Sequence, residues 1–176
     1  LQPLNLRNVV RDLKPVLQRL VGEKVRIELH EAAELPLVQA SVVHLEQLLL
    51  NLVINARDAM AEGGVLTITT GLQRAATALG EDGAQRVVLQ VRDTGIGMDE
   101  ATQAAIFDAF FTTKASQGGA GLGLSIVRDV VDRHGGTIRV ESALGQGSTF
   151  EVTFPSVRTS AEDDARAASF AAQPAD

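Results

Sequence analysis

The chain has 176 residues, of which 45% are hydrophobic and 22% charged, enough for one globular domain with a sizeable core. Its formal net charge of −6 argues against general nucleic-acid binding, because nucleic-acid-binding domains usually carry a basic surface. It has no cysteine, so disulfides, thiolate metal sites and thiol catalysis are excluded.

The N-terminal part predicts a helix followed by two short strands. Apolar residues recur at helical spacing over Leu4–Leu20, where Pro15 marks either a kink or a helix start, and Gly22 ends the helix. Val25–Leu29 alternates as a strand does, and we expect Leu35–Ala40 to be its short antiparallel partner.

The stretch His44–Met60, HLEQLLLNLVINARDAM, predicts one long helix that Ser41 caps and a Glu-Gly-Gly run ends. A helix this apolar should be mostly buried. Its polar stripe must then contact protein, water or a ligand, because a buried unpaired amide costs about 1–3 kcal/mol. The stripe contains His44, Gln47, Asn51, Asn55 and Asp58.

Asn51 and Asn55 lie one turn apart, so their amide oxygens can point the same way. Oxygen ligands of this kind suit Mg²⁺ that is shared with substrate phosphates. The alternative is that both amides satisfy neighbouring backbone groups.

Two strands, Val65–Leu72 and Val87–Arg92, are predicted next, with a hairpin loop over 74–85 between them. A loop, DTGIGM, runs from Asp93 to Met98, and a short helix follows over Asp99–Ile106. Asp93 can accept hydrogen bonds at the strand end, and the two glycines allow a flat ligand to approach the backbone. A tight turn with a capping aspartate is the alternative.

Residues Phe107–Ala120 have no clear period, and we expect a mobile loop. The run GGAGLGLS then opens a helix over Gly121–His134, and a glycine-rich helix start is suited to phosphate. A flexible hinge is the alternative. Neither Walker nor Rossmann spacing fits.

Thr137–Ser142 and Thr149–Phe154 predict a final hairpin, and residues 156–176 read as a tail or linker. We therefore expect one domain over residues 1–155 with an α+β fold. It should be a two-layer sandwich, with a mixed, mostly antiparallel sheet and helices on one face. Of the histidines, we expect His30 at the surface, His44 in a structural role and His134 at a helix C-terminus.

Five motifs in one order resemble the ATP-binding catalytic domain of sensor histidine kinases, in the superfamily of gyrase B, Hsp90 and MutL. They are LLLNLVINARDAM, DTGIGM, IFDAFFTTK, GGAGLGLS and GQGSTF, and they span most of the chain from about Leu4 to Pro155. NARDAM and FFTTK look most similar to nitrogen-regulation and hybrid kinases. The resemblance implies the Bergerat fold, with ATP and Mg²⁺ as ligands.

The resemblance also implies roles for individual residues. Asn55 would bind Mg²⁺ with help from Asn51, and Asp93 would accept a hydrogen bond from the adenine amino group. Residues 107–120 would form a mobile ATP lid that carries Lys114 near the phosphates. The nucleotide-binding set is Asn51, Asn55, Asp93, Gly95, Gly97, Met98, Lys114, Gly119, Gly121, Leu122, Gly123, Leu124 and Thr149.

Asn51 and Lys114 are the residues to which we assign catalysis. ATP-hydrolysing relatives have a glutamate base where this chain has Asn51, and asparagine is a poor base. The resemblance therefore implies transfer of the γ-phosphoryl group to a protein histidine rather than hydrolysis. Many relatives also carry Lys or Arg where this chain has Asp58, preceded by Arg57.

The resemblance implies partners outside this chain, since none of its histidines lies in a phosphoacceptor setting. These are the dimerisation and histidine-phosphotransfer domain of the same protein and a response regulator or receiver domain, but no nucleic acid. The fragment should be monomeric and the full-length protein a homodimer. A non-catalytic regulatory nucleotide-binding module of the same fold is the alternative.

The sequence has no apolar stretch long enough for a bilayer and no N-terminal signal pattern. We therefore expect the domain in the cytoplasm, either free or as the cytosolic part of a membrane-bound sensor.

Overall fold

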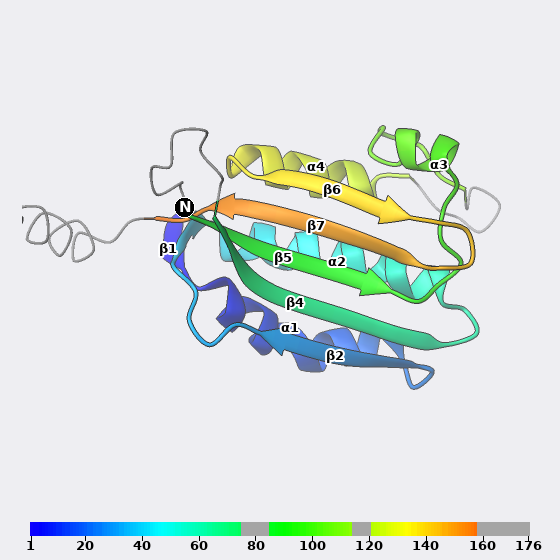
Figure 1. Cartoon of the computed structure of the whole chain (residues 1–176), viewed down its shortest axis with the longest axis horizontal. Coiled ribbons are helices and arrows are strands. Elements are labelled where there is room, and N and C mark those ends of the chain that lie inside the picture. The colour runs from blue at the N-terminus through cyan, green and yellow to red at the C-terminus, as the bar shows by residue number, and fades with distance from the viewer. Residues whose placement is uncertain (75–84, 114–120, 158–176) are drawn as a thin grey trace, which may run out of the picture.

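The computed structural model describes residues 1–74, 85–113 and 121–157, which form a sheet with helices packed on one of its faces (Figure 1). The elements, in chain order, are β1 (Gln2–Leu4), α1 (Leu6–Val21), β2 (Val25–Glu31), β3 (Val38–Ala40), α2 (Val42–Ala59), β4 (Gly64–Arg74), β5 (Gln85–Asp93), α3 (Glu100–Ala105), α4 (Gly123–Arg133), β6 (Thr137–Ser142) and β7 (Ser148–Pro155).

The main sheet has five strands within the described residues, in the order β2-β4-β5-β7-β6. β2 and β4 are parallel, and the other neighbours are antiparallel. Helices α1, α2 and α4 lie behind this sheet in Figure 1. The predicted α+β sandwich, with a mixed and mostly antiparallel sheet covered on one face, is therefore confirmed.

The predicted pairing of Leu35–Ala40 with Val25–Leu29 is wrong. β3 instead pairs antiparallel with β1, a strand of three residues that is too short to give a periodic signal. β2 pairs with β4, because the helix α2 between them provides the long crossover that a parallel pair requires.

Helix α1 begins and ends at side-chain and glycine signals. The Asn5 side chain accepts a hydrogen bond from the Arg7 N–H at 3.0 Å and so caps its start. Gly22, at a φ of 76°, ends it as predicted. Pro15 lies inside the helix on an exposed position, so it does not mark a helix start.

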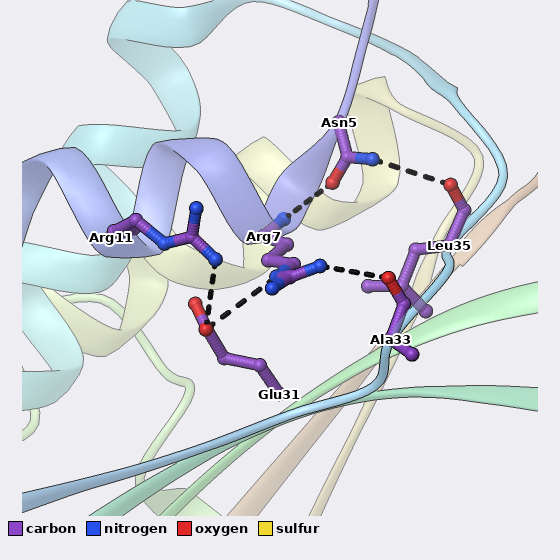
Figure 2. Close-up of polar contacts among 6 residues, drawn as sticks. All are labelled: Asn5, Arg7, Arg11, Glu31, Ala33 and Leu35. Carbon is purple, nitrogen blue, oxygen red and sulfur yellow. Dashed lines mark hydrogen bonds and ion pairs between the residues drawn. The ribbon is translucent and has the colours of Figure 1, made fainter.

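A polar cluster ties α1 to the end of β2 (Figure 2). Glu31 Oε2 lies 3.1 Å from Arg11 Nη2 and 3.5 Å from Arg7 Nε. Arg7 Nη1 also donates to the Ala33 carbonyl at 2.7 Å. The hydrogen bond from Arg11 lowers the pKa of Glu31 from its usual 4.5, against the opposing effect of burial.

Helix α2 is the central helix of the covering layer and packs between α1 and α4. The Ser41 hydroxyl accepts from the His44 N–H at 3.5 Å, so the predicted cap is confirmed. The α2 residues that are fully buried in the core are Leu45, Leu48, Leu49, Leu52, Val53 and Ala56.

His134 joins the end of α4 to the start of α2. Its Nδ1 donates to the Val130 carbonyl at 2.6 Å, and its Nε2 accepts from the Ser41 N–H at 3.2 Å. These partners require the neutral ring with hydrogen on Nδ1. The rings of His44 and Phe154 pack edge-on against it. The predicted helix-terminal role of His134 is confirmed.

Both described ends of the chain lie beside β3. Val38 forms an antiparallel bridge with Ser156, and the Val157 N–H donates to the Leu37 carbonyl at 2.7 Å. Strand pairing thus extends to Ser156, the first residue of the stretch predicted as a tail. None of the helices in the described part of the chain is long and apolar enough to cross a membrane.

Candidate nucleotide-binding site

A cavity of about 410 Å³ opens between the C-terminal half of α2, the loop after β5 and the start of α4. Residues of α3, of 111–113 and of β7 complete its wall. It brings together motifs that are far apart in the sequence. The predicted site residues that line it are Asn51, Asn55, Asp93, Gly97, Met98, Gly121, Leu122, Gly123 and Leu124.

The two asparagines of α2 both face this cavity. Asn51 lies against the start of α4, where its Oδ1 is 3.6 Å from the position a Cβ would take on Gly123. Asn55 Nδ2 is buried and has no hydrogen-bond partner among the described residues. Buried amides are usually bonded, so this group at the cavity wall is well placed to bind a ligand.

Asp93 forms the floor of the cavity at the end of β5 and is only 3% exposed. Its Oδ1 accepts hydrogen bonds from the Gly95 N–H at 2.8 Å and the Ser148 N–H at 3.3 Å. A buried carboxylate held in this way presents an acceptor to a ligand at a fixed position.

The loop after Asp93 is bonded on both sides. The Ile96 N–H donates to the Ala59 carbonyl at the end of α2, at 3.0 Å, and the Ile96 carbonyl accepts from Gly145 at 2.7 Å. Gly95 packs so closely on Ala59 that a Cβ would overlap its carbonyl, and Gly97 packs on Ala143 in the same way. Gly97 lines the cavity, whereas Gly95 contacts α2 and is not part of the cavity wall.

The start of α4 also lines the cavity. Gly121 has a φ of 67°, and its carbonyl accepts from the Phe110 N–H at 2.9 Å. Leu122 occupies the capping position without a side-chain hydrogen bond. The first turn of α4, whose backbone N–H groups have no partner within the helix, therefore begins in the cavity wall. Lys114 and Gly119, which we predicted to contact phosphates, lie outside the described residues.

The last motif contributes Ser148 rather than the predicted Thr149. Side chains alternate along β7, so Ser148 and Phe150 face the helices and line the cavity, while Thr149 faces the other side of the sheet. The Ser148 hydroxyl lies 2.9 Å from that of Ser142, which accepts from the Met98 N–H at 2.8 Å. Nothing in the sequence pattern singled out Ser142.

The phenylalanine motif divides between core, cavity and surface. Phe107 packs edge-on against Phe150 and lies under the Arg128 guanidinium, 5.6 Å from its ring centroid. Phe111 lines the cavity, whereas Phe110 is 75% exposed and has a φ of 67°. The aperiodic sequence gave no signal for this division.

Asp58 also lines the cavity, one turn after Asn55. Its Oδ1 accepts from Arg57 Nε at 2.9 Å and from Arg57 Nη2 at 2.7 Å. The sequence left open which of these neighbouring side chains acts at the site. In the structure the two form a pair in which the carboxylate is part of the wall.

A model of the family "Histidine kinase-, DNA gyrase B-, and HSP90-like ATPase" matches residues 40–158 of the chain. Sensor kinase CckA of Brucella abortus is 40% identical over 159 residues, which cover 86% of this chain and 17% of that protein. Sensor histidine kinase ZraS of Escherichia coli is 37% identical over 156 residues, covering 88% and 31%. The chain thus spans less than a third of the length of these relatives.

The chain is also similar to solved structures of histidine kinases. Full-length ShkA in complex with AMPPNP is 31% identical with a TM-score of 0.71, covering 90% of this chain and 32% of that chain. The catalytic domain of histidine kinase ThkA is 30% identical with a TM-score of 0.64, covering 87% and 92%.

Proposed function

The chain belongs to the family of histidine kinase-, DNA gyrase B- and HSP90-like ATPases, and we propose that it is the ATP-binding catalytic domain of a two-component sensor histidine kinase. In this proposal it binds Mg-ATP and donates the γ-phosphoryl group to a histidine on a dimerisation domain outside this chain. The observation that carries the proposal is that Asn51, Asn55, Asp93 and the glycine-rich start of α4 line the same cavity.

In the proposed complex the nucleotide base lies at the Asp93 end of the cavity. The Asp93 carboxylate accepts a hydrogen bond from the adenine amino group, which favours ATP over GTP because guanine presents a carbonyl there. The Gly97 backbone lets the base approach closely. The phosphates lie at the start of α4, where unpaired N–H groups and the helix dipole favour anions. That ShkA was solved with AMPPNP supports a nucleotide ligand.

The donor set also fits Mg²⁺. The buried Nδ2 of Asn55 has no hydrogen-bond partner among the described residues. Because the oxygen and nitrogen of an amide are assigned from their hydrogen-bond partners, nothing among these residues holds the two in this orientation. The amide can therefore present its oxygen to the cavity, as a hard cation requires. Asn55, with Asn51, would hold the ion, which when bound neutralises phosphate charge.

Asn51 faces the phosphate end, and an amide cannot take a proton from water as a carboxylate base does. The proposed catalysis therefore depends on positioning: Asn51 and the first turn of α4 orient the phosphates, while Asp93 fixes the base. Lys114 stays a predicted contact to the phosphates.

The proposed partners are the dimerisation and histidine-phosphotransfer domain and a response regulator or receiver domain. We propose that the isolated domain is monomeric, that the whole kinase is a homodimer and that the domain works in the cytoplasm.

Phosphoryl transfer gives the direct test. The protein is mixed with γ-labelled Mg-ATP and with the helical hairpin that carries the phosphoacceptor histidine of the full-length kinase. We expect acid-labile label on that histidine. ATP binding without any label would contradict the proposed catalysis and favour a regulatory nucleotide-binding module.

Replacing Asp93 tests the base contact. In Asp93→Asn a neutral amide replaces the carboxylate, and we expect ATP affinity to fall by about tenfold or more, because a charge-assisted hydrogen bond contributes about 1.5–3 kcal/mol. Isothermal titration calorimetry measures the change. Unchanged affinity for ATP, with a circular dichroism spectrum like that of the unmodified protein, would refute the assigned role.

A further inference from the structure

The cavity has one buried acidic group and one partly exposed acidic group. Among its described lining residues the charged side chains are Asp58 and Asp93. Asp93 is buried at the floor, whereas the side chain of Asp58 is 31% exposed. The two carboxylates therefore meet different parts of any ligand that fills the cavity.

Asp58 lines the cavity from the last turn of α2. It comes seven residues after Asn51 on α2, about 10 Å further along the helix axis from the start of α4. It directly precedes Ala59, whose carbonyl holds the loop that follows Asp93. A nucleotide with its base at Asp93 and its phosphates at α4 would place its sugar beside this part of α2.

The chemistry of a carboxylate limits what Asp58 can bind there. An ionised carboxylate accepts hydrogen bonds or coordinates a hard cation such as Mg²⁺, and it repels phosphate. The ribose hydroxyl groups are the hydrogen-bond donors in the middle part of a nucleotide, so they are the groups there that can donate a hydrogen bond to Asp58.

Arg57 makes this carboxylate compatible with an anionic ligand. Arg57 donates through Nε and Nη2 to Oδ1 of Asp58, at 2.9 and 2.7 Å, and does not itself line the cavity. Its positive charge offsets the negative charge of Asp58 close to the site.

We infer that Asp58 is a specificity-determining residue that accepts a hydrogen bond from a ribose hydroxyl group, and that Arg57 compensates its charge. This inference deepens the proposed function and rests on it. It makes the domain selective for ribonucleotides at the sugar, independently of the selection of the base by Asp93.

The experiment compares three ligands by isothermal titration calorimetry in the presence of Mg²⁺: ATP, 2′-deoxy-ATP and 3′-deoxy-ATP. We expect the unmodified protein to bind at least one deoxy analogue about tenfold more weakly than ATP, as loss of a hydrogen bond to a charged group requires. In Asp58→Ala the ratio between ATP and that analogue should fall to about one.

Two further variants separate the sugar contact from general effects. Asp12→Asn removes an exposed carboxylate on α1, away from the cavity, and should keep the ratio of the unmodified protein. Arg57→Ala should bind all three ligands more weakly, because the charge of Asp58 is then uncompensated, but should keep discriminating between the sugars.

Equal binding of the three ligands by a protein that does bind ATP would overturn the inference and leave the proposed function standing. An unchanged ratio in Asp58→Ala would also overturn it. Failure of the unmodified protein to bind any of the three would overturn the proposed function, and the inference with it.

Discussion

Gly145 and Gly147 lie two positions apart in the β6–β7 hairpin and differ only in their surroundings. Both have left-handed backbone, with φ of 75° and 76°. A Cβ on Gly145 would meet nothing within 4 Å, but on Gly147 it would overlap the carbonyl oxygen of Asp93. Gly147 therefore allows the hairpin to lie directly against the residue at the floor of the cavity.

This pair gives a matched test. Gly145→Ala should lower the free energy of unfolding by about 1–2 kcal/mol, the cost of left-handed backbone for alanine. Gly147→Ala should cost clearly more and should also weaken ATP binding, because Asp93 must move. Urea unfolding and calorimetry check both effects. Equal losses in the two variants would show that the contact with Asp93 does not matter.

Most of the site residues predicted from the sequence motifs do line the cavity. Asparagines at helical spacing and glycines at a helix start point to a ligand directly. In GQGSTF the sequence pointed to Thr149, whereas the strand register places Ser148 in the cavity wall. It gave no signal for Thr102 in the cavity wall or for Ser142, which accepts a hydrogen bond from the Met98 N–H, since both depend on the packing of distant segments.

Helix α1 and strand β2 are joined by the Glu31 cluster, and this contact should depend on pH. The pKa of Glu31 is lowered in the folded protein, so its stabilising effect is complete above its usual pKa of 4.5 and is lost as pH falls through the lower folded value. Acid should therefore weaken the attachment of α1.

Glu31→Gln tests this contact. At about pH 7 we expect it to lower the free energy of unfolding by about 0.5–1 kcal/mol, since the pair is partly exposed. The difference from the unmodified protein should shrink below about pH 4.5 as Glu31 takes up a proton. Urea unfolding between about pH 7 and pH 3 measures it. Glu28→Gln, which removes a more exposed carboxylate from β2, is the control. A difference that does not change with pH would contradict the assignment.

Helices α2 and α4 are joined by His134, whereas its neighbour His44 makes a ring contact and has a buried Nδ1 without a partner among the described residues. His134→Phe should cost about 1–3 kcal/mol, because the Ser41 N–H and Val130 carbonyl lose their partner. His44→Phe keeps a ring and removes an unpaired polar atom, so it should be close to neutral. Thermal and urea unfolding compare them, and equal costs would refute the bridging role of His134.

At the scale of elements, the periodic helices were predictable and the two strands of three residues were not. The helices at the positions of α1, α2 and α4 follow from apolar spacing and from caps such as Ser41. β1 was missed, and β3 was assigned the wrong partner, because strand pairing is a long-range property that three residues cannot encode alone.

At the scale of the whole molecule, the order of strands and helices predicted the layered fold. It did not predict which strand lies at the edge of the sheet beside β4. β2 lies at the edge because it pairs parallel with β4, with α2 in the connection between the two strands. This pairing depends on the packing of α1 and α2 on the sheet, which is a property of the folded chain. The cavity then lies where the C-terminal half of α2 and the start of α4 meet the end of β5 and the start of β7.

Strand β3 lies at the opposite end of α2 from the cavity, and both described ends of the chain pair with it. Residues 2–4 and Ser156 both pair with β3, beside the N-terminal end of α2 (Figure 1). The cavity is lined by the C-terminal half of that helix. The 18 residues of α2 correspond to an arm of about 27 Å. A rigid-body rotation of about 10° about β3 would therefore carry a bound nucleotide through about 5 Å without disturbing a contact within the site.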